Sequence, residues 1–228
     1  MLIDTHSHIY SEDFLTDRDE ALQRAYESGV KKIVLPNIDS GSIKHMLDLT
    51  DAYPHLCYPL MGLHPTSVDE DYKEELQAIE YWLEKRKFYG IGEIGVDLYW
   101  DKKFEEEQKN AFLHQIRLAK KYELPIVIHV RNSFEETYEI VKKEQDGSLK
   151  GVFHCFTGDE LEAQKIIDLG FLLGIGGVLT FKNSPLDEVV KKIDIHNLVL
   201  ETDAPYLSPV PKRGKRNESS YLMYIAQK

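Results

Sequence analysis

The amino-acid sequence predicts an α/β fold and, within that class, a closed (β/α)8 barrel. Short apolar runs alternate with longer amphipathic segments along the whole chain, and ionisable side chains stand at the ends of most of these runs. A length of 228 residues suits one barrel, and a hydrophobic share of 42% is enough for a core. An open, doubly wound sheet is the alternative fold, but it would leave some of the ionisable strand ends far apart. We therefore expect one barrel domain over residues 1–228.

Eight short apolar runs are predicted strands, because parallel strands that helices cover are buried on both faces. These strands are residues 2–5, 32–35, 56–61, 89–93, 126–129, 151–154, 171–175 and 198–202. The segments between them are predicted helices, at residues 17–28, 40–52, 71–87, 104–122, 134–143, 159–169 and 186–193. A last helix is expected to begin near Asn217.

Local signals support the ends and faces of these elements. Gly29 follows the first helix, where glycine commonly ends a helix. Ser40 can cap the second helix, since serine is a favoured N-cap residue. In the fourth helix, Phe112, Ile116 and Ala119 recur at helical spacing and predict a buried face.

Net charge and cysteine content narrow the classes of protein. The formal net charge of −11 argues against a protein that coats nucleic acid, because such binding needs concentrated Lys and Arg. It leaves open an enzyme that engages a few phosphates through metal ions. Cys57 and Cys155 are the two cysteines, too few for a disulfide framework. With no signal peptide and no run of about 18–20 apolar residues, we expect a reduced cytoplasmic protein without a membrane span, and no protein partner is evident.

Side chains that can bind metal stand at the carboxyl ends of several predicted strands. They are His6 and His8 after the first strand, Glu93, His129 and His154 at the ends of the fourth, fifth and sixth, and Asp203 after the eighth. Barrel enzymes build their active sites at this face, and closure brings the strand ends together. His6 and His8 are two residues apart, so they point the same way along a strand. A lone His-x-His pair or a single glutamate is commonly structural, but the joint arrangement predicts a metal site.

The predicted ligand set is larger than one ion needs. Imidazole and carboxylate together suit Zn²⁺, Mn²⁺ and similar ions. Six ligands exceed a four-coordinate catalytic site, and a carboxylate can bridge two ions. Two ions about 3.5–4 Å apart can clamp the attacking and leaving oxygens of a displacement and generate hydroxide near neutral pH. We therefore expect a hydrolase with two divalent ions.

Specific motifs are spread along nearly the whole chain. They are IDTHSH (3–8), GLHP (62–65), GIGEIGVD (90–97), IHVR (128–131), HCFTG (154–158), GFLLGIGGVLTFK (170–182), ETDAPYL (201–207) and PVPKRGKRNE (209–218). Together they resemble the TatD family of metal-dependent deoxyribonucleases, within the amidohydrolase-like superfamily of metallo-dependent hydrolase barrels. Many metallohydrolases share His-x-His, whereas the last two motifs and HCFTG are specific in combination. Members of that family usually continue beyond the position of Lys228, so we expect the last helix to be shortened.

The resemblance implies a division of labour among the ligands. His6, His8 and Asp203 would hold one ion, His129 and His154 the other, and Glu93 would bridge the two. Related amidohydrolases often bridge with a carbamylated lysine, whereas the TatD pattern has this glutamate. The implied reaction is 3′–5′ exonuclease cleavage of single-stranded DNA by a metal-activated water, with Mg²⁺ or Mn²⁺ as working ions and Zn²⁺ as an alternative. Asp203 and Glu93 are the expected catalytic residues, with Asp203 as acceptor of the water proton.

Other functions stay open on the same residues. The barrel and its metals would equally support hydrolysis of a small amide, lactone or phosphoester. Deacylation of a modified aminoacyl-tRNA is a further alternative, because the metal ligands do not settle the substrate. A non-catalytic binding protein on an old enzyme fold would be marked by a missing ligand, and none is missing.

Cationic residues near the strand ends are the candidates for substrate contact. His64 can donate to a phosphate or hold its own loop, and Arg131 offers a bidentate fork to a phosphate. A basic patch follows the last strand and either grips the DNA backbone or is a solvated loop. It consists of Lys212, Arg213, Lys215 and Arg216.

Five further residues have a role that the sequence leaves open or structural. Tyr99, Trp100 and Phe181 either stack on bases or belong to the core. Glu201 either orients a neighbouring ligand or is a buried structural carboxylate. Cys155 follows a predicted ligand, but strand alternation turns it away, so we expect it to pack in the core.

Overall fold

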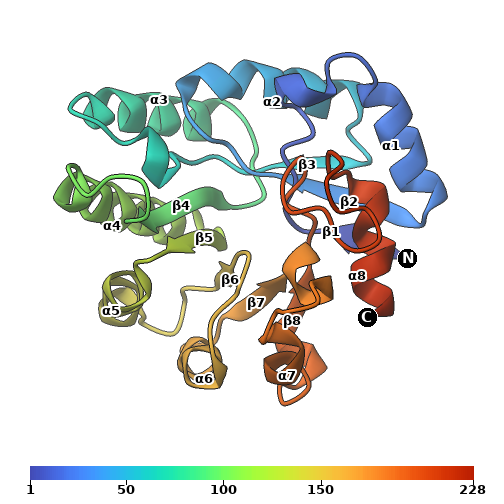
Figure 1. Cartoon of the computed structure of the whole chain (residues 1–228). Helices are drawn as coiled ribbons and strands as arrows, with labels where there is room; N and C mark the ends of the chain where they lie inside the picture. The colour runs from blue at the N-terminus through green and yellow to red at the C-terminus, as the bar shows by residue number, and fades with distance from the viewer.

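The computed structural model describes residues 1–228. Its strands are β1 (Leu2–Asp4), β2 (Val30–Leu35), β3 (Cys57–Pro59), β4 (Ile91–Asp97), β5 (Ile126–Arg131), β6 (Gly151–Phe153), β7 (Leu172–Ile175) and β8 (Leu198–Leu200). Strands that follow one another in the chain also lie side by side. β1, β2 and β3 form one parallel sheet, and β4 to β8 form a second. The strands surround the centre of the molecule in Figure 1.

Two junctions close these sheets into a ring. At the first, Ser7 bridges Ala204 in the parallel sense, and the His8 amide donates to the Ala204 carbonyl oxygen at 2.7 Å. At the second, Met61 bridges Ile91. Backbone pairing therefore continues around the whole ring, which confirms a closed (β/α)8 barrel and not an open sheet.

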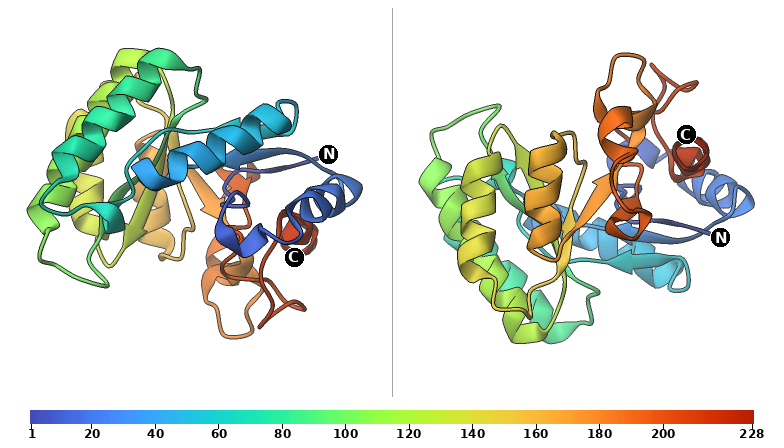
Figure 2. Two further views of the ribbon diagram at one scale, coloured as in Figure 1. Left: turned by 90° about the horizontal axis from the view of Figure 1, so that it is seen from above. Right: turned by 90° about the horizontal axis from the view of Figure 1, so that it is seen from below.

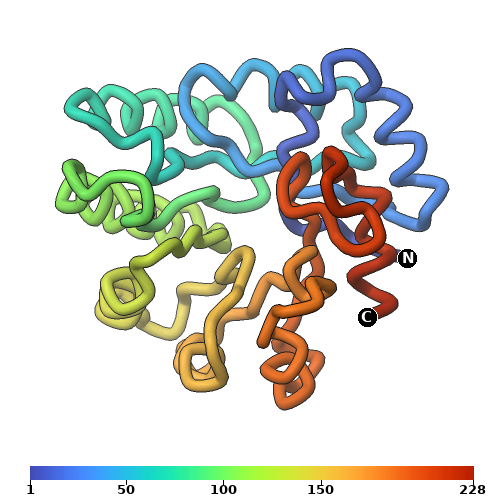
Figure 3. Tube along the Cα trace, in the orientation of Figure 1, coloured from blue at the N-terminus to red at the C-terminus, as the bar shows by residue number.

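Eight α-helices follow the strands and cover the barrel from outside. They are α1 (Arg18–Glu27), α2 (Ser40–Ala52), α3 (Tyr72–Lys85), α4 (Glu105–Tyr122), α5 (Phe134–Glu144), α6 (Glu160–Asp168), α7 (Leu186–Val190) and α8 (Leu222–Gln227). Figure 2 shows this outer layer from above and from below. The two terminal segments lie close together, as the tube in Figure 3 shows. None of the helices combines the length and the apolar character needed to cross a membrane.

One cluster of apolar side chains fills the space between strands and helices. Phe112, Ile116 and Ala119 of α4 belong to it and are buried, as their helical spacing predicts. Ile33 of β2 and Phe153 of β6 are buried in the same cluster. This core fixes the strands and so positions the residues at their carboxyl ends.

Strand ends near the candidate site differ from those predicted. β4 continues to Asp97, so Glu93 lies inside the strand, whereas we expected it at the end. β5 also continues past His129, to Arg131. The apolar pattern stops early in these segments because glycine and charged residues follow, but backbone pairing between Gly95 and His129 and beyond extends both strands.

Other boundaries also need correction. Asp39, not Ser40, caps α2: its carboxylate accepts the Ser42 amide at 2.9 Å, and the Ser42 hydroxyl accepts the Asp39 amide at 3.1 Å. The last helix does not begin near Asn217. A single 3-10 turn, Ser219–Tyr221, precedes α8, because the buried Asn217 side chain instead donates to the backbone oxygens of neighbouring loops.

An ionic network joins α1 to the segment before α8. The Arg216 guanidinium lies 2.6 Å from an Asp17 carboxylate oxygen, and Arg24 lies 3.0 Å from the same carboxylate and 2.6 Å from Glu218. Hydrogen bonding to Arg216, opposed by burial and aided by Arg24, lowers the pKa of Asp17 to about 2. Arg216 is thus engaged within the protein.

We expect Arg216→Ala to lower the free energy of unfolding by about 1 kcal/mol at pH 7, since the pair is partly exposed. A carboxylate with a lowered pKa stabilises the fold fully above its unfolded value and loses that effect as pH falls through its folded value. The difference from wild type should therefore shrink between pH 3.8 and about 2. Urea denaturation at several pH values measures it, with the exposed neighbour Lys215→Ala as control. A difference that is independent of pH would contradict this role of Asp17.

Candidate metal centre

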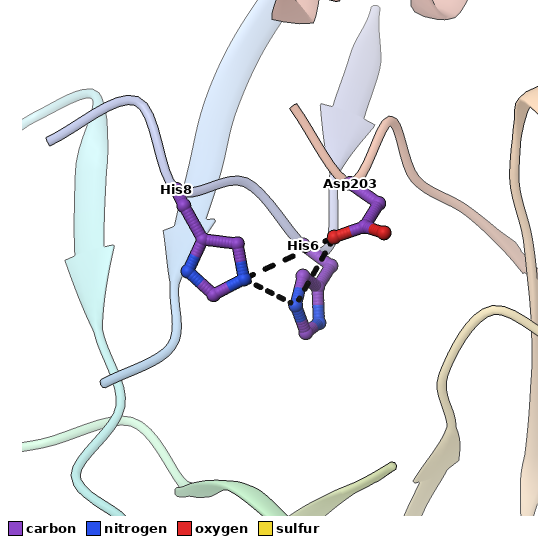
Figure 4. Close-up of side chains that lie close together, drawn as sticks. All are labelled: His6, His8 and Asp203. Carbon is purple, nitrogen blue, oxygen red and sulfur yellow. Dashed lines mark hydrogen bonds and ion pairs between the residues drawn. The ribbon is translucent and has the colours of Figure 1, made fainter. Parts of the chain in front are cut away.

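Side chains from the ends of β1 and β8 converge at the carboxyl face of the barrel. Figure 4 shows the rings of His6 and His8 and the Asp203 carboxylate turned toward one point. His6 Nε2 lies 3.2 Å from His8 Nε2, and Asp203 Oδ1 lies 3.8 Å and 3.9 Å from these two nitrogens. The three residues form one compact group of donor atoms.

Glu93 presents its two oxygens to two groups of histidines. Its Oε2 lies 3.0 Å and 3.5 Å from the Nε2 atoms of the histidine pair just described. Its Oε1 lies 2.8 Å from His129 Nδ1, 3.4 Å from His64 Nε2 and 3.7 Å from His154 Nε2. One carboxylate therefore faces both groups, which is the arrangement a bridging ligand requires.

A local irregularity in β4 turns Glu93 into the barrel. The pairing register with β5 shifts between Ile91 and Ile94, and the Glu93 amide donates to the Asn37 carbonyl oxygen at 3.2 Å. Further along, Gly95 pairs with His129 at a φ of +148°, and a Cβ there would overlap the His129 carbonyl oxygen. The glycine thus permits the close approach of β4 and β5 that sets Glu93 beside His129.

The second ring nitrogen of His8 is held by a hydroxyl group. His8 Nδ1 lies 3.1 Å from the Tyr10 oxygen, and the Tyr10 hydroxyl donates its proton to the Pro36 carbonyl oxygen at 2.5 Å. The Tyr10 oxygen must therefore accept from His8 Nδ1–H. This fixes the tautomer in which His8 Nε2 carries a lone pair and faces the other donors.

Carboxylates lie beside the second nitrogens of two further histidines. Asp97 Oδ2 lies 2.9 Å from His129 Nε2, and Glu201 Oε1 lies 2.9 Å from His154 Nδ1. Glu201 Oε1 also accepts the Cys155 amide at 2.6 Å. Of the two readings that the sequence left open for Glu201, the contacts favour the orienting role. Such partners orient histidine ligands and raise their basicity.

In His64 it is Nδ1 that accepts a hydrogen bond, whereas in His8 it is Nδ1 that donates one. The Thr66 amide donates to His64 Nδ1 at 3.1 Å, and burial lowers the pKa of His64, so the ring is neutral. A neutral ring that accepts at Nδ1 carries its proton on Nε2. His64 therefore points an N–H toward Glu93 and the space above it, and its ring also belongs to a group of donor atoms with Glu93 and His129.

Burial and neighbouring charges set the protonation of the two central carboxylates. Burial raises the pKa of Glu93, but the histidines around it outweigh burial and hold the pKa well below its ordinary value. Burial raises the pKa of Asp203 to about 6, against the opposing effect of His154 and His8. Glu93 is therefore an anion at neutral pH, whereas the pKa of Asp203 lies closer to neutral pH.

The chemistry and spacing of the donors fit divalent cations. The two nitrogens of the His6–His8 pair lie 3.0–3.9 Å from the nearest oxygens of Glu93 and Asp203. Ligand atoms about 2.1 Å from a common ion lie about 3.0–3.4 Å from one another, so a small contraction would complete the shell. No lysine or arginine pairs with either carboxylate, which leaves their charge available to a metal.

A pocket of about 630 Å³ opens above these donors. His64, Trp100 and Arg131 line it, so the structure brings these three candidates for substrate contact to the site. The Arg131 guanidinium lies 3.8 Å from the centre of the Tyr99 ring and 5.1 Å from that of Trp100. Their contact with a substrate stays a prediction.

The basic patch lies outside the lining of this pocket. It consists of Lys212, Arg213, Lys215 and Arg216. Arg216 pairs with Asp17, as described above. Arg213 stacks 3.8 Å above the Phe181 ring and donates to the Ser208 carbonyl oxygen at 3.1 Å. The other three cations of the patch line a separate hollow with Arg24 of α1 and Tyr224 of α8.

Cys155 is not a core residue, contrary to our expectation. It follows the end of β6 and adopts a φ of +47°, so strand alternation no longer decides its direction. The side chain is half-buried and lines the pocket beside His154. Our prediction failed because it extended the strand one residue too far.

The sequence predicts no role for Asp97 or Tyr10, two buried residues that contact the histidines. Asp97 is four residues after Glu93 and shares its strand parity, which is a signal for the same face of β4. Tyr10 continues the two-residue spacing of His6 and His8, but β1 has ended there, so this spacing carries less weight.

Comparison with protein families identifies the chain. A family profile described as TatD related DNase matches residues 3–228. The chain belongs to the TatD family. This relationship spans the barrel and every donor described above.

TatD relatives match the chain along nearly its whole length. YabD of Bacillus subtilis (strain 168), an uncharacterized metal-dependent hydrolase, is 40% identical over 100% of this chain and 89% of its own. TatD of Salmonella typhimurium, named a 3′-5′ ssDNA/RNA exonuclease, is 30% identical over 100% and 89%. The crystal structure of YjjV, a TatD homologue from Escherichia coli K12, superposes with a TM-score of 0.92 at 31% identity, covering 98% of this chain and 87% of that one. The protein is thus a TatD-family metal-dependent hydrolase with clusters able to bind metal.

Proposed function

We propose that this TatD-family hydrolase is a 3′–5′ exonuclease of single-stranded DNA that works with two divalent ions. The observation that carries the proposal is Glu93, whose two oxygens face two separate groups of histidines. The name of the Salmonella relative supports a nucleic-acid substrate. Mg²⁺ and Mn²⁺ suit phosphodiester chemistry, and Zn²⁺ also fits the donors.

The proposed ligands divide between the two ions. His6, His8 and Asp203 would hold one, His129 and His154 the other, and Glu93 would bridge them. When bound, such a pair lowers the pKa of water and neutralises charge on phosphoryl oxygens. Asp203 would accept the proton of the attacking water at its carboxylate.

Two further residues would orient the phosphodiester. His64 presents its fixed Nε2–H to the pocket and would donate to a phosphoryl oxygen. Arg131 would add a bidentate contact from its guanidinium edge. The basic patch at Lys212, Arg213, Lys215 and Arg216 lies outside the pocket, so its contact would be with more distant phosphates of a longer strand.

Asp97 provides a test of the second ion's site. Asp97→Asn removes the carboxylate that holds His129 Nε2, and we expect metal affinity to fall by about 10- to 100-fold. Calorimetric titration with Mn²⁺ measures this loss, and much of the hydrolysis rate should return at high Mn²⁺. Asp51→Asn, at a surface pair with Arg86, is the control. Unchanged Mn²⁺ affinity would contradict a role of Asp97 in metal binding.

The activity itself is tested with labelled oligonucleotides. Metal-stripped protein is incubated with 3′-labelled and with 5′-labelled single-stranded DNA, with and without Mg²⁺ or Mn²⁺. We expect metal-dependent release of mononucleotides from the 3′ end. Absence of cleavage by protein whose bound metal has been measured would contradict the proposal and direct the search to a small amide, lactone or phosphoester, or to an aminoacyl-tRNA.

A further inference from the structure

Aromatic side chains stand on two opposite sides of the metal pocket. Trp100 follows β4, Tyr206 follows β8, and both line the pocket. β4 and β8 are four places apart in the closed ring of eight strands and lie on opposite sides of its centre (Figure 1), so Trp100 and Tyr206 come from strands on opposite sides of the ring. Trp100 is 70% exposed and Tyr206 56%. Flat apolar faces that open to water at a pocket mouth are typical of a binding surface.

On the β4 side of the pocket, a cation without an ion-pair partner lies against the aromatic rings. Arg131 stacks on Tyr99 and Trp100, and no carboxylate lies within ion-pair distance of its guanidinium. Stacking holds the group in place while its N–H edge stays free for an anion. Asp97 Oδ1 accepts the Tyr99 amide at 2.9 Å, so the carboxylate that holds His129 also positions this side.

The second side is anchored to the segment that carries Asp203. The Tyr206 amide donates to the Asp203 carbonyl oxygen at 2.8 Å. Buried Asn217 donates from its side chain to the Tyr206 carbonyl oxygen at 2.6 Å. The Tyr206 ring stands edge-on to His8, 6.3 Å between centres. The backbone of Tyr206 is therefore fixed, while its ring face remains exposed.

We propose that Trp100 and Tyr206 form a two-sided clamp for consecutive bases of a single strand, one on each side of the phosphodiester that lies above the donors. The clamp rests on the proposed function and specifies how its single-stranded substrate would be bound. Arg131 would contact the phosphate next to the base on Trp100. Stacking accepts every base, because every base has a π face. In a duplex the bases are already stacked and paired, so the clamp would select unpaired strands and not a sequence.

Binding of a single strand tests the clamp directly. The probe is a fluorescent single-stranded oligonucleotide with phosphorothioate linkages, which slow hydrolysis, and binding is measured by anisotropy in Mg²⁺. Trp100→Ala and Tyr206→Ala should each weaken binding by about 5- to 100-fold. Trp100→Phe and Tyr206→Phe keep a ring and should retain most of the affinity. Tyr81→Ala is the matched control, because Tyr81 on α3 is also 56% exposed and lies away from the pocket.

The kinetic readout separates a clamp from a general defect. The loss of kcat/KM in each alanine variant should be at least about tenfold larger on an oligonucleotide than on bis(p-nitrophenyl) phosphate, which has no base to stack. Affinity equal to wild type in either alanine variant, or equal losses in Tyr81→Ala, would overturn the clamp.

The clamp and the proposed function can fail separately. Wild-type protein that binds the oligonucleotide, with affinity lost in the alanine variants but without cleavage, would support the clamp and contradict the nuclease. Cleavage with affinity unaffected in either alanine variant would contradict the clamp alone. Wild-type protein that does not bind the single strand would overturn the clamp.

Discussion

Glu93→Ala is expected to abolish hydrolysis and to reduce bound metal at the same time. The variant removes both oxygens that face the two groups of histidines, and with them a carboxylate whose low pKa keeps it charged. We expect a loss of kcat on the order of 10³-fold or more, because neither ion would keep its shared ligand. Metal content by mass spectrometry and hydrolysis of a labelled oligonucleotide should fall together.

Two matched variants make this result specific. Glu93→Gln keeps the size of the side chain and loses its charge, so it should bind metal poorly while it folds normally. Glu80→Ala removes a half-buried carboxylate on α3 that pairs with His114, and it should change neither quantity. Full activity in Glu93→Ala would exclude a bridging role and the two-ion proposal with it.

Gly95→Ala is expected to destabilise the barrel strongly. An added Cβ would meet the His129 carbonyl oxygen, and the φ of +148° is one that L side chains rarely adopt. We expect the free energy of unfolding to fall by about 3 kcal/mol or more, because strain and overlap add. Urea denaturation measures the loss. Relief of the overlap must also part β4 from β5 and so draw Glu93 away from His129.

Gly147→Ala separates the two causes of that loss. Gly147 has a φ of +91°, but nothing lies within 4 Å of an added Cβ. It should therefore show only the conformational penalty, about 1 kcal/mol. Equal losses in the two variants would mean that the approach of β4 to β5 is not tight, contrary to the structure.

Strand count and closure could be predicted because burial imposes a simple pattern on parallel strands. Each apolar run marks a strand, and the polar residues at its end mark the face of the site. Strand length was harder to predict: in β4 the sequence turns glycine-rich and charged at Glu93, while pairing with β5 continues to Asp97. Hydrophobicity reports burial, and it does not report backbone pairing.

The convergence of histidines and carboxylates could also be predicted, because each of them lies at or after the end of an apolar run, even though Glu93 and His129 lie inside longer strands. What the sequence could not give was the direction of each imidazole ring. His64 and His8 look alike as residues near strand ends, yet the Thr66 amide makes one a donor and the Tyr10 hydroxyl makes the other an acceptor. Such roles depend on hydrogen-bond partners in loops, which no periodic pattern encodes.

The candidate metal centre lies where the two sheets of the barrel meet, so metal binding would also affect the stability of the barrel. The three-stranded and five-stranded sheets meet at two seams, marked by the bridges Ser7–Ala204 and Met61–Ile91 and crossed by further backbone hydrogen bonds. His6 and His8 follow β1 of one sheet, whereas Glu93 lies in β4 and Asp203 follows β8 of the other, and all four lie next to these seams. We expect an ion held by both sets to tie the two sheets together. Occupancy of the site would then add to the free energy of unfolding, because the ion binds the folded barrel and not the unfolded chain.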